Sequence, residues 1–526
     1  MSRRTAWRDC ILLFLLALLV RALTVPLLSG PGYMDAAYYI DGALNLYEGR
    51  GFNDLFLWNY MGDPTGIPQP SHLYWMPLSS MLIYLSFLVL GPTFRAAQVP
   101  FVLLSALLPV LSYWVAYDIA QKRRHAVVSG LLTILSGFYL LRWVTPDNFA
   151  PFAVAGGVCL WTLGRGLEKP GWGWFALSGI GAGLGHLSRA DGMLLVVVAG
   201  LMILWSAYRD RTQIRRLALG LVWLVVGYGI VMGPWFVRNW IAIGRPLATD
   251  GTQTVWLTNY DDLFGYQIPL TVDRYLAWGW GNIVSSKLRG LWLNLQTVLF
   301  VGWMIFLIPP GLAGVWRLRK RVSFQGAWWY LVVLYLTMSL VFTFAGWRGG
   351  MLHSLVALLP FLYAAAMEGL DAFCSWMARR RRNWRAREAQ AVFSGAAVVF
   401  GLALSIVLAV QVAPAAGAEH PYRRVAGWLA AEGDPQARVM INDPATFFYY
   451  GRRPCVVIPN GGLETVIEVM RRYDVQWLVL DENNPTLHEL FVDPRQEPRL
   501  ELVQTLQEPD PVSNTVHIFR LKESGE

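Results

Sequence analysis

Several stretches of this chain are long and apolar enough to cross a lipid bilayer as a helix. Residues 11–30, 219–237 and 391–410 are three such runs, and each can span roughly 30 Å of hydrocarbon. Only 15% of the residues are charged, against about 25% in soluble domains. The 25 Trp and 22 Tyr suit the aromatic belts at the two membrane interfaces. The sequence therefore predicts a polytopic α-helical membrane protein.

Basic residues gather in clusters between the apolar runs. Under the positive-inside rule such clusters stay in the cytoplasm. This placement accounts for the formal net charge of +9 without a nucleic-acid partner. The clusters are residues 1–4, 121–125, 208–216, 317–321 and 377–387.

The apolar runs between these clusters must satisfy a parity condition. Three apolar stretches lie between the first two clusters, and an even number of them must cross. The middle stretch, residues 76–91, is the shortest, begins next to a proline and contains three serines, so we expect it to lie along the external interface. Eleven crossings remain: roughly residues 10–29, 96–118, 126–143, 149–167, 172–188, 191–208, 215–236, 287–316, 327–345, 351–371 and 389–412.

This count decides which segments face outward. The N-terminus is predicted to be cytoplasmic, with the first apolar run acting as an uncleaved signal anchor. The first loop, about residues 30–95, is then external. So are the short turn 142–148 and the segment from about residue 413 onward.

The hydrophilic segment 413–526 has the pattern of a small α/β domain. Residues 437–443 and 475–481 are strand-like, and residues 462–473 have helical apolar spacing. Strand, helix, strand implies a parallel pair. We find no glycine-rich phosphate loop or nucleophile motif in this segment, so we expect an accessory domain beside a membrane module of residues 1–412. The four cysteines show no pairing pattern, and neither a disulfide nor a zinc site is predicted.

Two aspartates stand at the predicted external membrane edge. Asp35 follows the first crossing in "GYMDAAYYIDGALNLY", and Asp147 lies in "TPDNFAPF". Either could simply cap a helix. Carboxylates from two external loops could also flank one substrate, one as base and the other as orienting group or metal ligand. Asp41 points in another direction on the same helix and is expected to be structural.

Four arginines occupy predicted external ends of crossings, where the positive-inside rule disfavours them. They are Arg95, Arg189, Arg238 and Arg348. Because the guanidinium fork matches phosphate, we expect the set to bind a phosphorylated substrate or an anionic lipid headgroup. In the first loop, His72 and Tyr74 are candidate substrate-binding residues, with an ordinary interfacial role as the alternative.

These stretches, taken in order, resemble the GT-C glycosyltransferases, which are polytopic enzymes that use polyprenyl-phosphate sugars. The chain is most similar to the protein O-mannosyltransferase and aminoarabinose-transferase branch. The likeness covers roughly residues 10–370 and rests on the first-loop motif, "PQPSHLYWMPLSSMLIYLSFLVLGPTFRAAQVPFVLL", "WVTPDNFAPFAVAGG", "GLGHLSRADGMLLV" and "GPWFVRNWIAIGRPL".

The resemblance implies an active site at the external interface. Asp35 would be the first-loop catalytic carboxylate, Asp147 the second-loop acid, and Arg95 the ligand of the lipid phosphate. Tyr38 and Tyr39 would stack on the sugar or the first isoprene unit, or else anchor the loop at the interface. The reaction would be an inverting, base-assisted transfer from a polyprenyl-phosphate sugar to a glycan, lipid or protein acceptor outside the cell membrane.

One feature departs from the family pattern. Many members carry an Asp-Glu pair in the first loop, whereas Asp35 is followed by Ala36 and Ala37. No metal cluster is predicted and no cofactor is certain; a divalent metal remains an option, with Asp147 and His72 as the pair to watch.

Two functions of other classes stay open, a transporter or flippase and a non-catalytic envelope-assembly scaffold. We find no repeat between the halves, and the candidate residues lie at one face rather than at the bilayer midplane, which disfavours transport. Asp261 and Asp262, in the long external loop 238–286, are expected to be solvated. The sequence does not name the sugar, the prenyl chain length or the acceptor.

Overall fold

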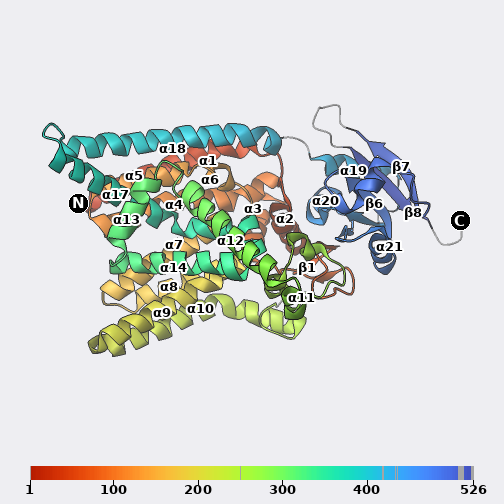
Figure 1. Cartoon of the computed structure of the whole chain (residues 1–526), viewed down its shortest axis with the longest axis horizontal. Helices are drawn as coiled ribbons and strands as arrows, with labels where there is room; N and C mark the ends of the chain where they lie inside the picture. The colour runs from red at the N-terminus through yellow and green to blue at the C-terminus, as the bar shows by residue number, and fades with distance from the viewer. Residues whose placement is uncertain are drawn as a thin grey trace.

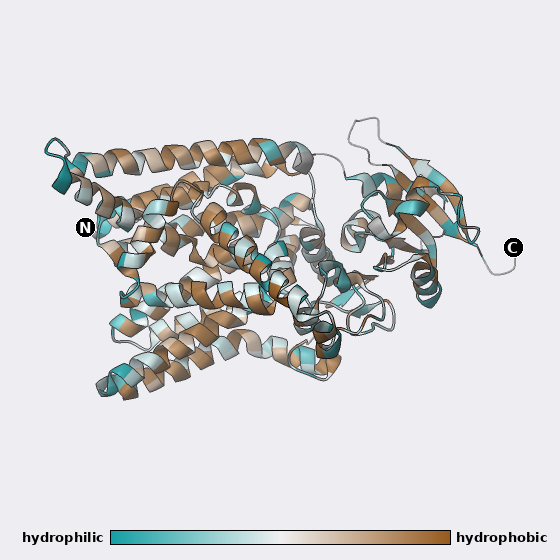
Figure 2. Ribbon diagram, viewed as in Figure 1, coloured by the Kyte–Doolittle hydropathy of each residue, from teal (hydrophilic) through white to brown (hydrophobic). Residues whose placement is uncertain are grey.

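The computed structural model of the chain describes residues 2–248, 250–417, 420–432, 434, 436–507 and 515–522. Its helices form a long bundle, and an α/β unit made of C-terminal residues lies at one end of that bundle (Figure 1). The N-terminus lies at the opposite end. Hydrophobic residues dominate the bundle helices, as the colouring in Figure 2 shows.

Seven helical stretches among the described residues are long and apolar enough to cross a membrane, which confirms a polytopic protein. They are Arg3–Leu27, Phe94–Ala120, Ala190–Arg209, Arg211–Ile243, Val322–Val341, Thr343–Arg380 and Ala386–Pro414. The bundle and its loops contain α1 (Arg3–Thr24), α2 (Met34–Tyr47), α3 (Leu78–Leu90), α4 (Phe94–Ala120), α5 (Arg123–Leu135), α6 (Tyr139–Arg142), α7 (Phe149–Glu168), α8 (Gly173–Ser188), α9 (Met193–Arg209), α10 (Ile214–Ile243), α11 (Val272–Ala277), α12 (Trp280–Gln296), α13 (Ile308–Leu318), α14 (Val322–Leu336), α15 (Thr343–Ala345), α16 (Met351–Leu355), α17 (Leu359–Arg380) and α18 (Ala386–Gly417).

Helix is present at each predicted crossing, but two of the predicted runs are interrupted rather than one continuous helix. The run 126–143 breaks after α5, where Ser136 and Gly137 both have positive φ angles (49° and 54°). The run 287–316 breaks between α12 and α13, where Met304 and Ile305 also have positive φ angles (49° and 62°). Hydropathy does not detect such breaks, because the residues remain apolar on both sides. The number of crossings therefore stays a prediction.

The stretch predicted not to cross forms α3, a helix of 13 residues. At 1.5 Å per residue it is about 20 Å long, which is shorter than the hydrocarbon core. Its length therefore agrees with a helix that does not span the bilayer.

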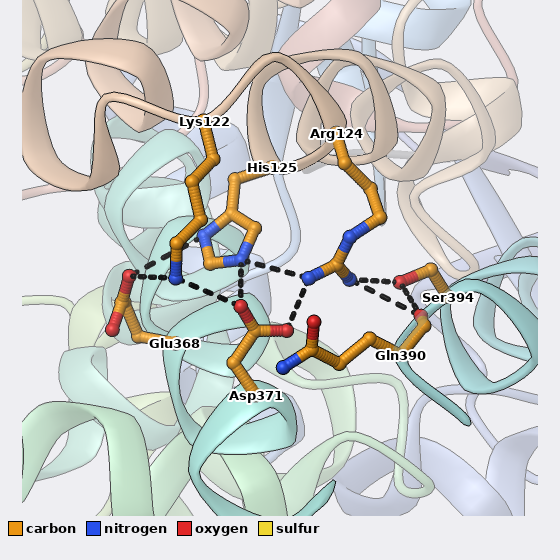
Figure 3. A network of polar contacts seen from close by, with 7 residues as sticks. All are labelled: Lys122, Arg124, His125, Glu368, Asp371, Gln390 and Ser394. Carbon is orange, nitrogen blue, oxygen red and sulfur yellow. Dashed lines mark hydrogen bonds and ion pairs between the residues drawn. The ribbon is translucent and has the colours of Figure 1, made fainter. Parts of the chain in front are cut away.

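A polar network ties the start of α5 to α17 and α18 (Figure 3). Asp371 on α17 accepts hydrogen bonds from Lys122 Nζ (2.9 Å), from His125 Nε2 (2.8 Å) and from Arg124. Arg124 also donates to the hydroxyl of Ser394 on α18. Several cationic donors around one buried carboxylate offset its loss of hydration. The basic segment that follows α4 is thus fixed against two other helices.

The C-terminal unit is built on a mixed sheet with the strand order β2-β5-β4-β6-β8-β7. Its strands from the C-terminal segment are β4 (Arg438–Ile441), β5 (Cys455–Val457), β6 (Val475–Asp481), β7 (Leu500–Leu506) and β8 (Val516–Leu521), and its helices are α19 (Pro421–Glu432), α20 (Pro444–Gly451), α21 (Leu463–Arg472) and α22 (His488–Val492). β4 and β6 are parallel neighbours, as their spacing in the sequence predicted. The domain boundary at residue 412 stays a prediction, and α18 continues to Gly417.

The edge strand β2 of this sheet comes from the first loop, a connection that the sequence did not reveal. The loop forms β1 (Asn53–Asp54), β2 (Phe56–Leu57) and β3 (Gln69–Pro70), and β1 pairs with β3. β2 runs parallel to β5, with Phe56 opposite Cys455. The C-terminal unit and the first loop therefore share one sheet.

Side chains and backbone groups reinforce this junction. Arg472 on α21 lies 2.7 Å from the carboxylate of Asp63, and Tyr473 Oη donates to the carbonyl of Pro64 (2.7 Å). The amide of Asn460 donates to the carbonyl of Phe264 in the long loop (2.9 Å). The C-terminal unit is thus joined to both long loops at this end of the bundle.

Candidate active site

Asp35 lies in the first turn of α2, directly after the first membrane helix. Helix N-termini favour acidic residues, because the free backbone amides there carry partial positive charge. The side chain is half-buried. Its position lets the carboxylate face the other groups at this end of the bundle.

Asp147 lies in the short turn between α6 and α7 and is fully buried, at 0% exposure. Tyr33 Oη donates a hydrogen bond to Asp147 Oδ2 (2.6 Å). The backbone amide of Asn148 donates to Oδ1. These two donors hold the carboxylate in one orientation.

His353, on α16, completes a cluster that sequence reasoning did not identify. Its Nδ1 lies 2.7 Å from Asn148 Oδ1 and 3.9 Å from Asp147 Oδ2, and its ring stacks on Phe149 at 3.9 Å. One ligand atom from each of Asp35, Asp147 and His353 falls within 4.8 Å of the others. The sequence analysis selected Arg348, five residues earlier in the chain, but not this histidine.

Burial and charge perturb both carboxylates. The pKa of Asp35 is raised to about 7, chiefly by burial and then by the neighbouring Asp147 carboxylate, while Arg189 opposes the shift. The pKa of Asp147 is also raised by burial, against the hydrogen bonds from Tyr33 and Asn148. Two close carboxylates resist ionising together, so at neutral pH Asp35 titrates in the range that suits a general base.

Two arginines lie beside this pair. Arg189 Nε donates to Asp191 (2.9 Å) and to Ser354 (3.0 Å), and its NH1 is 3.4 Å from Asn148 Oδ1. Arg142, which the sequence analysis did not select, stacks over the Tyr33 ring at 4.9 Å. Arg189 reaches the neighbour of Asp147 in the chain, Arg142 stacks on the tyrosine that bonds to Asp147, and both guanidinium groups lower the pKa of Asp147.

The other predicted arginines have different surroundings. Arg348 is exposed and stacks over the ring of Tyr260 at 4.5 Å, and the charge of Asp35 in turn reaches the Tyr260 hydroxyl. Arg95 is also exposed, and it donates to the carbonyl of Val25 (2.6 Å) at the end of the first membrane helix. Arg348 therefore lies beside Tyr260, whose hydroxyl pKa the Asp35 carboxylate helps to raise, whereas Arg95 bonds to the end of the first membrane helix.

Arg238 belongs to the first loop rather than to the cluster. Its NH2 donates to the carbonyl of Phe52 (2.8 Å), and the guanidinium stacks over Trp235 at 4.7 Å. These contacts attach the end of α10 to the first loop.

The predicted substrate-binding residues divide between two places. Tyr39 Oη accepts a hydrogen bond from Asn148 Nδ2 (3.1 Å) and so lies at the cluster. Tyr38 Oη donates to Asp54 (2.9 Å) and accepts from the amide of His72 (2.7 Å), which places both residues inside the first loop. Tyr74 packs edge-on against Trp58 and Trp75 of the first loop, and the Asp35 carboxylate helps to raise the pKa of its hydroxyl.

His72 is not the histidine that accompanies Asp147. Its ring packs edge-on against Tyr38, Phe52 and Trp235, and burial lowers its pKa to about 3. The imidazole is therefore neutral and enclosed by aromatic rings. The metal pair considered from the sequence is replaced by a trio in which His353 takes the place of His72.

By spacing alone, Asp35, Asp147 and His353 could hold a divalent cation, since carboxylate and imidazole groups are common ligands. The charge around them argues otherwise, because the guanidinium groups of Arg142 and Arg189 already act on Asp147. A dication would be added next to two fixed cations. We therefore derive no step through a metal.

Of the two long-loop aspartates that were predicted to be solvated, Asp262 has a structural role. Asp262 Oδ2 accepts hydrogen bonds from the amides of Thr258 (2.9 Å) and Asn259 (3.0 Å), and Arg274 donates to its other oxygen (2.9 Å). Asp262 is buried rather than solvated, which corrects the prediction for that residue. Asp41 is buried on α2, away from the cluster, with Arg452 NH1 3.8 Å from its carboxylate.

Comparison with known proteins places this site in a family context. Residues 70–235 match the family model described as dolichyl-phosphate-mannose-protein mannosyltransferase. That range includes Asp147 and Arg189 but neither Asp35 nor His353. No curated protein matches the sequence.

Solved structures match over most of the chain. Apo ArnT from Cupriavidus metallidurans superposes with a TM-score of 0.61 at 14% identity, covering 98% of both chains. The same protein bound to undecaprenyl phosphate gives 0.58 at 14% identity, again over 98% of both chains. The oligosaccharyltransferase AglB from Archaeoglobus fulgidus, in complex with an inhibitory peptide and a dolichol-phosphate, gives 0.59 at 13% identity, covering 91% of this chain and 70% of that chain.

These matches show the fold. The chain has the GT-C fold, as the resemblance of its sequence motifs predicted. It is a multi-pass membrane protein with a small α/β unit near its C-terminus.

Proposed function

We propose that this protein is a membrane glycosyltransferase that moves a sugar from a polyprenyl-phosphate donor to a hydroxyl acceptor. The convergence of Asp35 and Asp147 beside arginine side chains, at one end of the bundle, is the observation that carries the proposal. The family model that matches residues 70–235 is described as a dolichyl-phosphate-mannose-protein mannosyltransferase, which supports sugar transfer from a lipid-linked donor. ArnT has been solved with undecaprenyl phosphate and AglB with dolichol-phosphate, which supports a lipid-linked donor.

The proposed step uses Asp35 as the base. The acceptor hydroxyl oxygen attacks the anomeric carbon of the donor while its proton passes to the Asp35 carboxylate. The bond between the anomeric carbon and the phosphate oxygen breaks, and polyprenyl phosphate leaves with the electron pair. Attack opposite the leaving group inverts the anomeric configuration. Asp147, held by Tyr33, orients the reacting groups and keeps the pKa of Asp35 high.

The leaving phosphate needs positive charge placed in advance. Arg348 is the best placed of the predicted arginines to contact it, because this side chain is exposed and makes no ion pair with the residues that the structure describes. Arg189 is committed to Asp191 and Ser354, so it acts mainly on the charge of the cluster. Preorganised positive charge at a developing anion is worth about 3 kcal/mol per donor in other enzymes.

The reaction is proposed to occur on the external face of the cell membrane. The cytoplasmic assignment of the basic clusters supports this, because it puts the end that carries Asp35 outside. The C-terminal unit would then be extracytoplasmic, at the end of the bundle opposite the N-terminus (Figure 1).

The two alternatives fit the site less well. A transporter would place its polar groups near the bilayer midplane, whereas these gather at one end of the bundle. A degenerate scaffold was suggested by the missing second acid of the first-loop motif. Asp147 supplies a second carboxylate from another loop, so the cluster still holds an acid pair.

Turnover of labelled donors tests the proposal. Purified full-length protein in detergent is incubated with a panel of radiolabelled polyprenyl-phosphate sugars, and release of polyprenyl phosphate is followed. We expect release by the wild type and its loss in Asp35→Asn, with Asp273→Asn, an exposed carboxylate on α11, as the matched control. No release from any donor, or equal release by Asp35→Asn, would refute the assignment.

A further inference from the structure

A cavity of about 280 Å³ opens within the first loop, apart from the carboxylate cluster. Asp54, Trp58 and Tyr74 form part of its wall, and the turn 61–66 forms much of the rest. The cavity is slightly smaller than the usual range of small-molecule sites, which is roughly 300–1,000 Å³. Its volume suits a compact group rather than an extended chain.

The carboxylate of Asp54 is a buried polar group in the wall of this cavity. Asp54 is 3% exposed, and its Oδ2 accepts a hydrogen bond from Tyr38 Oη (2.9 Å). Its Oδ1 has no hydrogen-bond partner among the described residues, although it is buried. A buried polar oxygen without a partner is costly, so its presence in a cavity wall points to a partner supplied from outside the chain.

Tyr38 fixes the direction of that carboxylate. Its hydroxyl donates to Asp54 and also accepts from the backbone amide of His72 (2.7 Å). Two bonds on one hydroxyl leave Asp54 little freedom to turn. Oδ1 is therefore held in place before any ligand arrives, which lowers the cost of binding.

Aromatic rings complete the wall. Trp58 stacks on Trp75 with ring centroids 4.1 Å apart and meets Tyr74 edge-on at 5.0 Å. The rings hold one another, and they present rigid apolar surface beside the polar oxygen. Flat apolar faces next to fixed hydrogen-bonding groups match a sugar ring, which has apolar C–H faces and a rim of hydroxyls.

The charged residues in the cavity wall further restrict the kind of ligand that can bind. Among the described residues lining the cavity, the charged ones are Asp54 and Asp63, and both are acidic. Asp63 is neutralised by Arg472 at 2.7 Å. An anionic group would meet an unpaired carboxylate with no cation in the wall, so phosphorylated or acidic ligands are disfavoured.

Tyr74 connects the cavity with residues near the carboxylate cluster. It lines the cavity and packs against the same buried residues as Tyr260, over which Arg348 stacks. The Asp35 carboxylate also helps to raise the pKa of the Tyr74 hydroxyl. The rim is held from the C-terminal unit, by Arg472 on Asp63 and by Tyr473 on the carbonyl of Pro64.

We infer that this cavity is the acceptor site and binds a neutral sugar unit of a glycan, with Asp54 accepting hydrogen bonds from its hydroxyls and Trp58 and Tyr74 contacting its ring. Only the assignment of the bound sugar as the acceptor rests on the proposed function, because sugar binding itself can occur without turnover. It commits the enzyme to a glycan acceptor rather than a peptide or a phosphorylated lipid. On this inference, the C-terminal unit stabilises the rim of the acceptor site.

Direct binding tests the site without a donor. Full-length protein in nanodiscs is titrated at pH 8 with neutral hexose, pentose and 2-acetamidohexose disaccharides, followed by saturation-transfer NMR and calorimetry. A hexose 6-phosphate and a serine-containing peptide serve as comparators. We expect at least one neutral disaccharide to bind, and neither comparator to compete with it.

Substitutions of cavity residues test whether the disaccharide binds in this cavity. Asp54→Asn should weaken the disaccharide about tenfold or more, because a hydrogen bond to a charged group is lost. Asp273→Asn, an exposed carboxylate on α11 that does not line the cavity, should stay within about twofold. Trp58→Leu gives a second loss of binding if Asp54→Asn does not fold. Binding by wild type that both Asp54→Asn and Trp58→Leu retain would overturn the site, as would no binding of any neutral sugar or preference for the peptide or the phosphate.

Donor turnover separates this inference from the proposed function. Release of polyprenyl phosphate to water, measured without acceptor, should persist in Asp54→Asn while transfer to the disaccharide is lost. Sugar binding by a wild type that consumes no donor would refute the transferase and leave the sugar site standing. Donor consumption with no sugar binding would refute the sugar site and leave the transferase standing.

Discussion

The pH dependence of transfer should report the ionisation of Asp35. Its pKa is raised from the ordinary value of 3.8 to about 7, so the base form is scarce in mildly acidic solution. With a pKa near 7, about 90% of the carboxyl is ionised at pH 8 and about 1% at pH 5. We therefore expect kcat/KM to fall about 90-fold between pH 8 and pH 5. An aspartate at 3.8 would lose only about 6% over the same range.

The neighbouring carboxylates that raise the pKa of Asp35 can be removed in control variants. Asp443, at the start of α20 in the C-terminal unit, contributes to raising the pKa of Asp35. Asp443→Asn removes that charge and keeps a residue that caps a helix equally well, so the midpoint should move to lower pH. Asp147→Asn should move it further, because the Asp147 carboxylate is the larger influence. Burial remains in both variants, so neither midpoint should return to 3.8.

The assay is release of polyprenyl phosphate from the best donor under kcat/KM conditions, at pH values from 5 to 9. Circular dichroism at each pH checks that the protein stays folded. A rate that is flat between pH 5 and pH 8 would refute Asp35 as a base with a raised pKa. A midpoint that rises in Asp443→Asn would refute the electrostatic reasoning.

Three further predictions follow from particular contacts. Arg348→Gln should lower kcat/KM for the donor about tenfold or more, whereas Arg95→Gln should lower it less, because Arg95 is already bonded to Val25; steady-state kinetics with the two variants decides this. Chelation with EDTA should leave donor turnover within about twofold, and loss of activity restored by a divalent metal would show that the carboxylate and histidine trio binds a cation. Phe56→Ala should destabilise the junction between the first loop and the C-terminal unit by about 3–5 kcal/mol, since Phe56 is fully buried in β2 and packs on Phe448. Limited proteolysis should then cleave the C-terminal unit faster than in Phe491→Ala, a half-buried phenylalanine of the same unit, and equal rates would contradict the prediction.

Parity reasoning from the sequence was enough to pair Asp35 with Asp147. The number of apolar runs between them put both at the same side, and the structure brings their carboxylates into one cluster. Parity does not indicate how far apart two residues lie on the same side of the membrane. It therefore grouped Arg95 and Arg238 with the aspartates as readily as Arg189, although their hydrogen bonds go elsewhere.

His353 and Arg142 show what the sequence could not supply. Each joins the cluster because its helix is rotated and packed so that one face meets the turn after α6. Hydropathy reports whether a helix is buried, but a helix that is apolar all round does not reveal which face will meet which neighbour. His72 was assigned to the first loop, but the sequence could not show that its ring packs against Tyr38 within that loop.

The sequence by itself determined the elements that depend on local composition. Apolar length decided the membrane helices, charge indicated their direction, and the spacing of strand and helix patterns predicted the parallel pair of the C-terminal unit. Only the tertiary structure decided that two residues of the first loop would complete that unit's sheet, that Asp54 would face a cavity, and that Asp443 would stand near Asp35. These pairings join segments up to about 400 residues apart, and their free energy comes from contacts that exist only after the helices have packed.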